Sequence, residues 1–327
     1  MERLKSSTVI LWVSVNLLTF FISDMVLAAN PIRVVMDQNV VSLYDDDGVL
    51  LRYSYKDVPF KPYVKEFFTP GGVNVLLDAP ADHLHHHALM FAVTADGVNF
   101  WEEQQAPGRQ VHQRFADVRV DSRDDAPFAG FSQRLDWQNP QSAQLVLKEI
   151  RTIEICNLVE PKAAILTWQS QFEAPDANES LTLSGSHYQG LGLRFVRSMD
   201  LEGEFRNADG KEGTVFRGEE RLVRSRWCAY TAKAQGKDVT VAMFDHPGNE
   251  RYPATWFMMN TPFAYLSATL ALHEQPLKVE LGKPLVLRYA VALWDGRIED
   301  AKIEELYKRW AALPRWTDGA PKPQPVK

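Results

Sequence analysis

Alternating apolar and polar positions run through most of the chain, from Ile32 to about Trp294. In residues 49–55 the odd-numbered side chains are all apolar or aromatic, whereas Arg52 and Ser54 fall between them. Because successive side chains of a strand point to opposite faces, this pattern predicts a strand with one face on a core. Residues 285–294 are apolar on both faces, which predicts a central strand between two layers and leaves Arg288 in need of a partner.

Turn residues separate these segments at intervals that suit hairpins. The pairs are Asp47-Gly48, Gly71-Gly72, Asp96-Gly97 and Asp209-Gly210. Only residues 298–313 show the three- and four-residue apolar spacing of a helix. The sequence therefore predicts an all-β fold, a large antiparallel β-sandwich with a short C-terminal helix. The sandwich should span residues 30–296, the packed helix 297–313 and a flexible tail 314–327.

The amino terminus has the pattern of an export signal. Arg3 and Lys5 precede an apolar stretch over residues 9–22, and small residues then favour cleavage after Ala28 or Ala29. The stretch is shorter than the ~20 residues that a membrane-spanning helix needs. We therefore expect a signal peptide over residues 1–29, and an exported protein, periplasmic or extracellular in a bacterium. We expect no membrane span in the mature chain.

The net charge limits the classes of partner, and the cysteine content limits the possible disulfides. The net charge of −6 comes without a dense basic run, which argues against nucleic acid and an anionic membrane surface as partners. A small molecule or a glycan suits this charge better. In an oxidising compartment Cys156 and Cys228 could form a disulfide, and two free thiols are the alternative. The oligomeric state does not follow from the sequence.

The densest chemistry lies in residues 82–87, where four of the eight histidines fall within five positions. Imidazole exchanges protons near neutral pH and is the commonest metal ligand. If a strand began near His85, alternation would place His85 and His87 on one face and His86 on the other. These three histidines could then not all serve one site, although an irregular loop would relax that limit. A solvated turn without function is the alternative.

Two further motifs carry charged residues beside glycine or a turn. Glycines at 190 and 192 clear space next to Arg194, which could bind a hydroxyl pair or a carboxylate, although a bulge with an ion pair would give the same pattern. Near residue 245 a predicted strand ends in Asp245-His246, where the carboxylate could orient the imidazole for catalysis. A turn without function is the alternative interpretation. Aromatic rings with polar side chains beside them suit the binding of sugars. The candidates in this sequence are Trp101, Glu102, Arg226, Asn249 and Tyr252.

Together these motifs resemble the secreted bacterial proteins labelled PmoA-like, or "methane oxygenase PmoA". The resemblance covers residues 34–296 and rests on residues 82–86, 99–101, 190–194, 226–227 and 244–256. Membrane methane oxidation needs a multi-span copper protein, so the label does not transfer as an activity. The resemblance implies instead a supersandwich similar to galactose mutarotases and related carbohydrate enzymes.

Three functions follow as hypotheses. The first is an exported carbohydrate-active enzyme, an epimerase, hydrolase or lyase, in which His83, His85, His86, Glu102 and His246 carry acid–base catalysis. Its substrate would be bound by Arg194, Trp101, Arg226, Asp245, Asn249 and Tyr252. The second is a metal-dependent hydrolase or oxidoreductase with His83 and His85 as ligands; otherwise no cofactor is expected. The third is a glycan-binding protein without catalysis, with Trp101, Trp227 and Trp256 as stacking surfaces.

Overall fold

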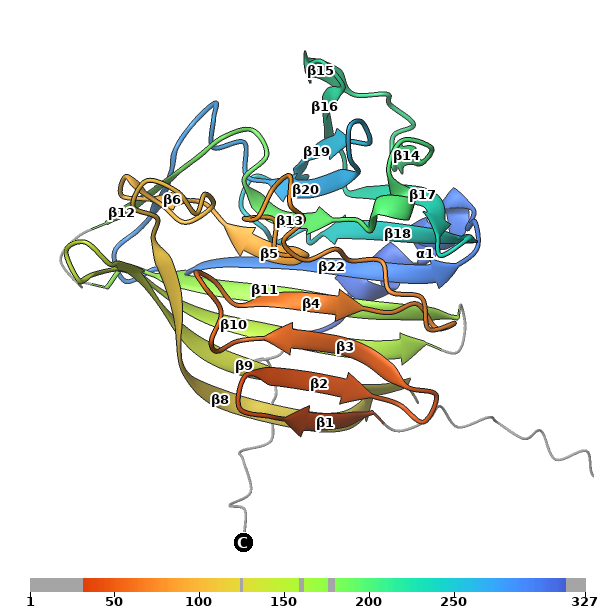
Figure 1. The fold of residues 1–327 in the computed structure, drawn as a ribbon, viewed down its shortest axis with the longest axis horizontal. Coiled ribbons are helices and arrows are strands. Elements are labelled where there is room, and N and C mark those ends of the chain that lie inside the picture. Colours follow the sequence, from red (N-terminus) through yellow and green to blue (C-terminus); the bar gives the residue numbers. More distant parts are fainter. Residues whose placement is uncertain (1–31, 124–125, 159–161, 176–179, 316–327) are drawn as a thin grey trace, which may run out of the picture.

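The computed structural model describes residues 32–123, 126–158, 162–175 and 180–315. In this part of the chain two large antiparallel sheets lie face to face, as the ribbon in Figure 1 shows. A small third sheet lies at one end of them. The predicted antiparallel β-sandwich with a short C-terminal helix is confirmed.

The first large sheet has ten strands among the described residues. In their order across the sheet they are β1 (Arg33–Met36), β2 (Val40–Tyr44), β3 (Val49–Ser54), β4 (Tyr63–Phe67), β5 (Leu89–Ala92), β13 (Gly190–Arg194), β20 (Tyr265–Thr269), β19 (Thr255–Met259), β16 (Glu220–Arg224) and β15 (Thr214–Arg217).

The second large sheet has eight described strands, several of them long. They are β14 (Glu204–Asn207), β17 (Trp227–Ala234), β18 (Lys237–Asp245), β22 (Leu285–Asp295), β11 (Ala163–Glu173), β10 (Gln144–Leu158), β9 (Ala126–Asn139) and β8 (Arg109–Arg123). The small sheet contains β21 (Leu277–Val279), β12 (Leu181–Ser184), β6 (Thr94–Ala95) and β7 (Val98–Asn99). A single 3-10 turn, η1 (Arg197–Met199), follows β13.

The main core lies between the two large sheets and follows from the alternation along each strand. On β3 the side chains of Leu51 and Tyr53 are fully buried, whereas Arg52 between them is partly exposed. At the tip of the β6–β7 hairpin, Asp96 and Gly97 both have positive φ, the conformation of the tight turn predicted there. Apolar burial between the sheets is the main stabilising contribution.

The predicted helix is α1 (Asp300–Ala311), and it covers the outer face of the second sheet. Its buried side chains are the predicted Ile303, Leu306, Tyr307 and Trp310. Strand β22 is central, and both of its faces are buried as expected. Arg288 has its partners at the end of α1 and just after it. It donates to the carbonyl oxygen of Leu313 at 2.8 Å and lies over the Trp310 ring.

Both cysteines carry free thiols in the structure. Cys228 is buried in the main core, and burial raises the pKa of its thiol well above the usual range. Cys156 packs at the edge of the separate cluster beneath α1. Of the two alternatives that the sequence left open, the structure has the free thiols. Among the described residues no helix has both the length and the apolar character needed to cross a membrane.

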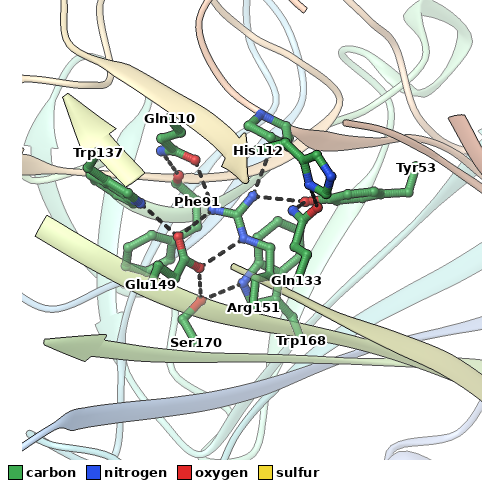
Figure 2. Close-up of polar contacts among 11 residues, drawn as sticks. Tyr53, Phe91, Gln110, His112, Gln133, Trp137, Glu149, Arg151, Trp168 and Ser170 are labelled. Carbon is green, nitrogen blue, oxygen red and sulfur yellow. Dashed lines mark hydrogen bonds and ion pairs between the residues drawn. The ribbon is translucent and has the colours of Figure 1, made fainter. Parts of the chain in front are cut away.

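A buried ion pair lies inside the main core, and Figure 2 shows its surroundings. The Arg151 guanidinium on β10 donates to both carboxylate oxygens of Glu149, at 2.9 and 2.8 Å, and both side chains are fully buried. Glu149 also accepts hydrogen bonds from the Trp137 indole at 2.8 Å and the Ser170 hydroxyl at 2.6 Å. Both oxygens of the Glu149 carboxylate are therefore hydrogen-bonded, as a buried charge requires.

The same guanidinium reaches across to the first sheet. It donates to the Tyr53 hydroxyl on β3 at 3.2 Å and to the carbonyl oxygen of Pro62 at 2.8 Å. The guanidinium is also linked to β5 through the Gln110 side chain. Gln110 accepts a hydrogen bond from Arg151 at 2.8 Å and donates one to the Phe91 carbonyl at 2.8 Å. Burial raises the pKa of Tyr53 to about 12, so its hydroxyl stays protonated at neutral pH. This network fixes one sheet against the other.

We predict that Arg151→Met destabilises the protein by about 3–5 kcal/mol, because it leaves the Glu149 carboxylate buried without its partner. Guanidinium chloride unfolding measures the change. Arg52→Met is the matched control, since the Arg52–Glu66 pair is partly exposed and pairs of that kind contribute about 0–1 kcal/mol. Equal losses in the two variants would contradict the importance of the buried pair.

Candidate functional site

Residues 82–87 form an irregular loop, and β5 begins only at Leu89. Two turns shape the loop: the His83 amide donates to the Pro80 carbonyl at 2.9 Å, and the His86 amide to the His83 carbonyl at 3.0 Å. The strand alternation considered from the sequence therefore does not apply. Because the loop is irregular, the rings of His83, His85 and His86 come together, with centroids 4.6–5.7 Å apart.

These three histidines line an open cavity of about 200 Å³ on the outer face of the first sheet. The cavity combines aromatic rings with charged groups. Its lining residues are His83, His85, His86, Trp101, Glu102, Tyr188, Arg217, Glu220, Phe257, Met259, Phe263 and Tyr265. Of the predicted site residues, His83, His85, His86, Trp101 and Glu102 thus lie at one site.

Gly192 on β13 lets two of the aromatic rings meet. A Cβ atom there would lie 2.0 Å from the Tyr265 hydroxyl oxygen and 3.1 Å from the Trp101 ring, so a larger residue would displace them. The segment that carries Trp101 and Glu102 is fixed by Asn99, whose side-chain oxygen accepts from both backbone amides at 2.8 and 3.1 Å. Asparagine is favoured in such turns because its side chain imitates a backbone acceptor.

His85 faces a carboxylate across this cavity. Its Nδ1 atom lies 3.6 Å from an oxygen of Glu102. Burial lowers the pKa of His85, although Glu102 acts in the opposite direction. The imidazole is therefore neutral near pH 7, and the neighbouring carboxylate favours the charged form after a proton is taken up.

His86 is the most buried of the three, at 7% exposure. Its ring stacks on His83 with centroids 4.6 Å apart and lies 4.9 Å from the Tyr265 ring. Burial, together with the nearby His85, His83 and Arg194, lowers the pKa of His86 to about 2. Its Nδ1 atom has no hydrogen-bond partner in the part of the chain that the structure describes.

His87 points away from the cavity and joins the two segments that form it. Its Nδ1 atom lies 2.9 Å from an Asp78 oxygen and its Nε2 atom 2.9 Å from Glu103, the neighbour of Glu102. Glu103 also accepts from the buried ammonium of Lys61 at 2.6 Å. Burial lowers the pKa of His87, but the hydrogen bonds to Asp78 and Glu103 outweigh it and leave that pKa raised.

Arg194 lies beside the cavity but does not line it. Its side chain is 1% exposed, donates to Asp82 at 3.0 Å and lies 3.7 Å from the centroid of the Phe263 ring. Asp82 also contacts His83 at 3.1 Å and thus links the Arg194 guanidinium to the histidine loop. These hydrogen bonds lower the pKa of Asp82 to about 2 despite its partial burial.

The other predicted site residues lie away from the cavity lining, where β17, the end of β18 and the following loop approach α1. Arg226 pairs with Glu304 at 3.0 Å, and the Tyr252 hydroxyl bonds to that of Tyr307 at 2.8 Å. His246 packs on Trp310. Partners in α1 account for each of these three residues.

Asp245 and Asn249 have structural partners in the same region. Asp245 is 2% exposed and accepts from the Asn249 amide and the Ala254 backbone amide, each at 2.7 Å. Burial raises the pKa of Asp245 to about 7. Asn249 also bonds to both backbone groups of Arg288. The three predicted stacking rings are all buried, with Trp101, Trp227 and Trp256 at 1%, 2% and 0% exposure, so none is an open stacking surface. Of the three, Trp101 alone is among the cavity-lining residues.

Several lining residues were missed by the sequence analysis. Glu220 and Arg217 flank a two-residue turn in a charged stretch that is typical of a solvated hairpin. The apolar rings of Phe257 and Phe263 resemble ordinary core residues in the sequence. Only the fold brings them to the histidines. Among the described residues, no three His, Cys, Asp or Glu side chains form a group that could hold a metal ion.

We predict that His86 makes stability depend on pH. The unfolded chain takes up this proton near pH 6.5, but the folded protein takes it up only near pH 2. The free energy of unfolding therefore falls as pH drops below 6.5, by up to about 1.4 kcal/mol per pH unit from this one group.

In unfolding titrations between about pH 6 and 4, His86→Phe should lose that part of the slope. His83→Gln serves as the control, because water reaches the His83 ring. An unchanged slope in His86→Phe would contradict the prediction.

Two solved structures are similar to this chain. The α-galactosidase from Lactobacillus brevis has 6% sequence identity and a TM-score of 0.44, with 82% of this chain and 40% of that chain covered. The galactose mutarotase related enzyme from Lactobacillus acidophilus has 8% identity and a TM-score of 0.35, with 82% and 98% covered. The chain thus spans 40% of the length of the α-galactosidase.

None of the curated proteins matches this chain. The PmoA-like resemblance stays a prediction. A family model described as a family of unknown function, DUF6807, matches residues 40–308. The chain therefore belongs to the DUF6807 family.

Proposed function

We propose that this protein is an exported carbohydrate-active enzyme that acts on a sugar ring by acid–base catalysis. The observation that carries the proposal is that three histidines and two glutamates line one cavity together with aromatic rings. Imidazole and carboxylate groups exchange protons near neutral pH, and aromatic rings stack on the apolar faces of sugars. Export is part of the proposal, and the proposed signal peptide lies outside the described residues.

The size and lining of the cavity favour a small polar ring as ligand. Its volume of about 200 Å³ is below the range of about 300–1,000 Å³ typical of sites for drug-sized molecules. The partly exposed ring of Tyr188 offers apolar surface, with the buried rings of Trp101 and Phe257 around it, and the carboxylates of Glu102 and Glu220 can accept hydrogen bonds from hydroxyl groups. One sugar ring, alone or at the end of an oligosaccharide, has this combination of surfaces.

His85 is the candidate base, with Glu102 as its partner. A neutral His85 that directs its Nδ1–H towards Glu102, 3.6 Å away, leaves Nε2 free to accept a proton from a sugar hydroxyl. The nearby carboxylate then stabilises the imidazolium until the proton passes to another atom of the sugar. Epimerisation, hydrolysis and elimination all use such a proton exchange, so the pair is compatible with each of them.

We predict that His85→Asn and Glu102→Gln each lower kcat by about 10²–10⁴-fold, the usual contribution of a positioned acid or base. The assay follows purified protein with D-galactose, D-glucose and their methyl and 4-nitrophenyl glycosides, by NMR for anomers and by mass spectrometry for gain or loss of water. His246→Asn is the control, since His246 packs on Trp310 away from the cavity lining. Sugar binding without any conversion would instead support a glycan-binding protein.

A further inference from the structure

A second histidine–glutamate pair lies at the same cavity, formed by residues that the proposed mechanism has not used. Glu220 on β16 lines the cavity, and one of its oxygens lies 3.0 Å from the Nε2 atom of His187. His187 belongs to the loop between β12 and β13, far from β16 in the sequence. The first pair, His85 and Glu102, comes from two other segments.

The Glu220 side chain is held on both oxygens. Arg217 donates to the other oxygen at 2.7 Å from across the tight β15–β16 turn. The side chain of Glu220 is 11% exposed, whereas that of Arg217 is 72% exposed. A surface ion pair of this kind adds little stability, so its effect is to fix the direction of the Glu220 side chain.

His187 is fixed by aromatic packing as well as by its hydrogen bond. Its ring stacks on Phe216 with centroids 3.8 Å apart and planes 22° apart, and its edge faces Phe257 at 5.5 Å. Burial lowers the pKa of His187, although Glu220 acts in the opposite direction. A neutral ring that faces a carboxylate carries its proton on Nε2 and donates it to the hydrogen bond.

Tyr188 connects the two pairs. It lines the cavity, its ring lies 5.4 Å from Trp101 and 6.1 Å from Phe257, and the negative charges of Glu102 and Glu220 both raise its pKa. Burial is the larger cause of that shift. Glu102, Glu220 and Tyr188 all line the same cavity, so both carboxylates can face a single bound ring.

We infer that Glu220 is a second catalytic carboxylate of this cavity, with His187 and Arg217 as its positioning residues. The inference rests on the proposed function. Acid–base chemistry on a sugar needs one group that takes a proton and another that gives one. Here an O–H bond of the sugar breaks as Glu220 accepts the proton. His85, which is neutral at rest, takes up a proton from water before this step, and its imidazolium then gives that proton to a second sugar oxygen, so the number of protons on the sugar and on the protein is unchanged in the step. In the reverse step His85 is the base, as proposed above.

The test compares Glu220→Gln with Glu219→Gln in the sugar panel described above. Gln has the shape of Glu but cannot accept the proton, so we expect kcat to fall by about 10²–10⁴-fold while the melting temperature stays near that of the wild type. Glu219 is the neighbouring residue in the turn and its side chain is 60% exposed. Glu219→Gln should stay within about twofold of the wild type, as is usual for changes at the surface.

Rescue by a conservative variant separates positioning from structural support. His187→Phe removes the hydrogen bond to Glu220 but keeps a ring that packs on Phe216, so we expect kcat to fall while KM and the melting temperature stay near those of the wild type. His187→Gln, which keeps an N–H donor, should restore kcat.

Three results decide between the proposals. A wild-type protein that converts none of these sugars overturns the proposed function and this inference with it. Activity that is lost in Glu102→Gln but retained in Glu220→Gln overturns this inference alone. Equal values of kcat in His187→Phe and His187→Gln would remove the positioning role of His187.

Discussion

The ion pair between Glu149 and Arg151 is the constraint on which the arrangement of the two sheets depends. Apolar side chains alone would let the sheets slide against one another, because the hydrophobic effect is not directional. The guanidinium instead meets Glu149 on its own sheet, and Tyr53 and the Pro62 carbonyl on the other. Because a buried charge without these partners costs several kcal/mol, arrangements that separate them are disfavoured. The pair thus selects one register between the sheets.

This constraint extends from the core to the candidate site through consecutive residues. Pro62 accepts from Arg151, and the preceding Lys61 donates to the Trp101 carbonyl at 3.2 Å and to Glu103 at 2.6 Å. Glu103 in turn contacts His87, which follows the cavity histidines. The segments that carry His85 and Glu102 are therefore both tied to the packed interior. Sites built on such a scaffold keep their geometry although the residues themselves lie on loops.

Periodicity was sufficient to predict the sandwich, the central strand β22 and the helix α1, because burial on one or both faces leaves a direct pattern in the sequence. The site was predicted only in part. His83, His85, His86, Trp101 and Glu102 lie close together in the chain, so their proximity was visible. Glu220 and His187 are 33 residues apart, and pairing between strands distant in sequence brings them to the cavity. Asp245 and His246 formed an equally suggestive motif, but the approach of α1 gives that region its structural partners.

The core and the cavity differ in how completely their polar atoms are bonded. In the Arg151 network, Glu149 accepts hydrogen bonds from Arg151 and Trp137. Gln110 accepts one from Arg151 and donates one to the Phe91 carbonyl. Around Gly192, by contrast, five buried atoms have no hydrogen-bond partner among the described residues: His86 Nδ1, Trp101 Nε1, the Tyr265 hydroxyl oxygen, and Nε and one terminal nitrogen of Arg194. Each buried polar group without a hydrogen bond costs about 1–3 kcal/mol. Other buried atoms, such as Gln169 Oε1 and Trp294 Nε1, also lack a partner in the described part of the chain, but five of the twelve gather beside this one cavity and lower the stability there. Departures of this kind from local optimisation are expected where a site binds a polar ligand.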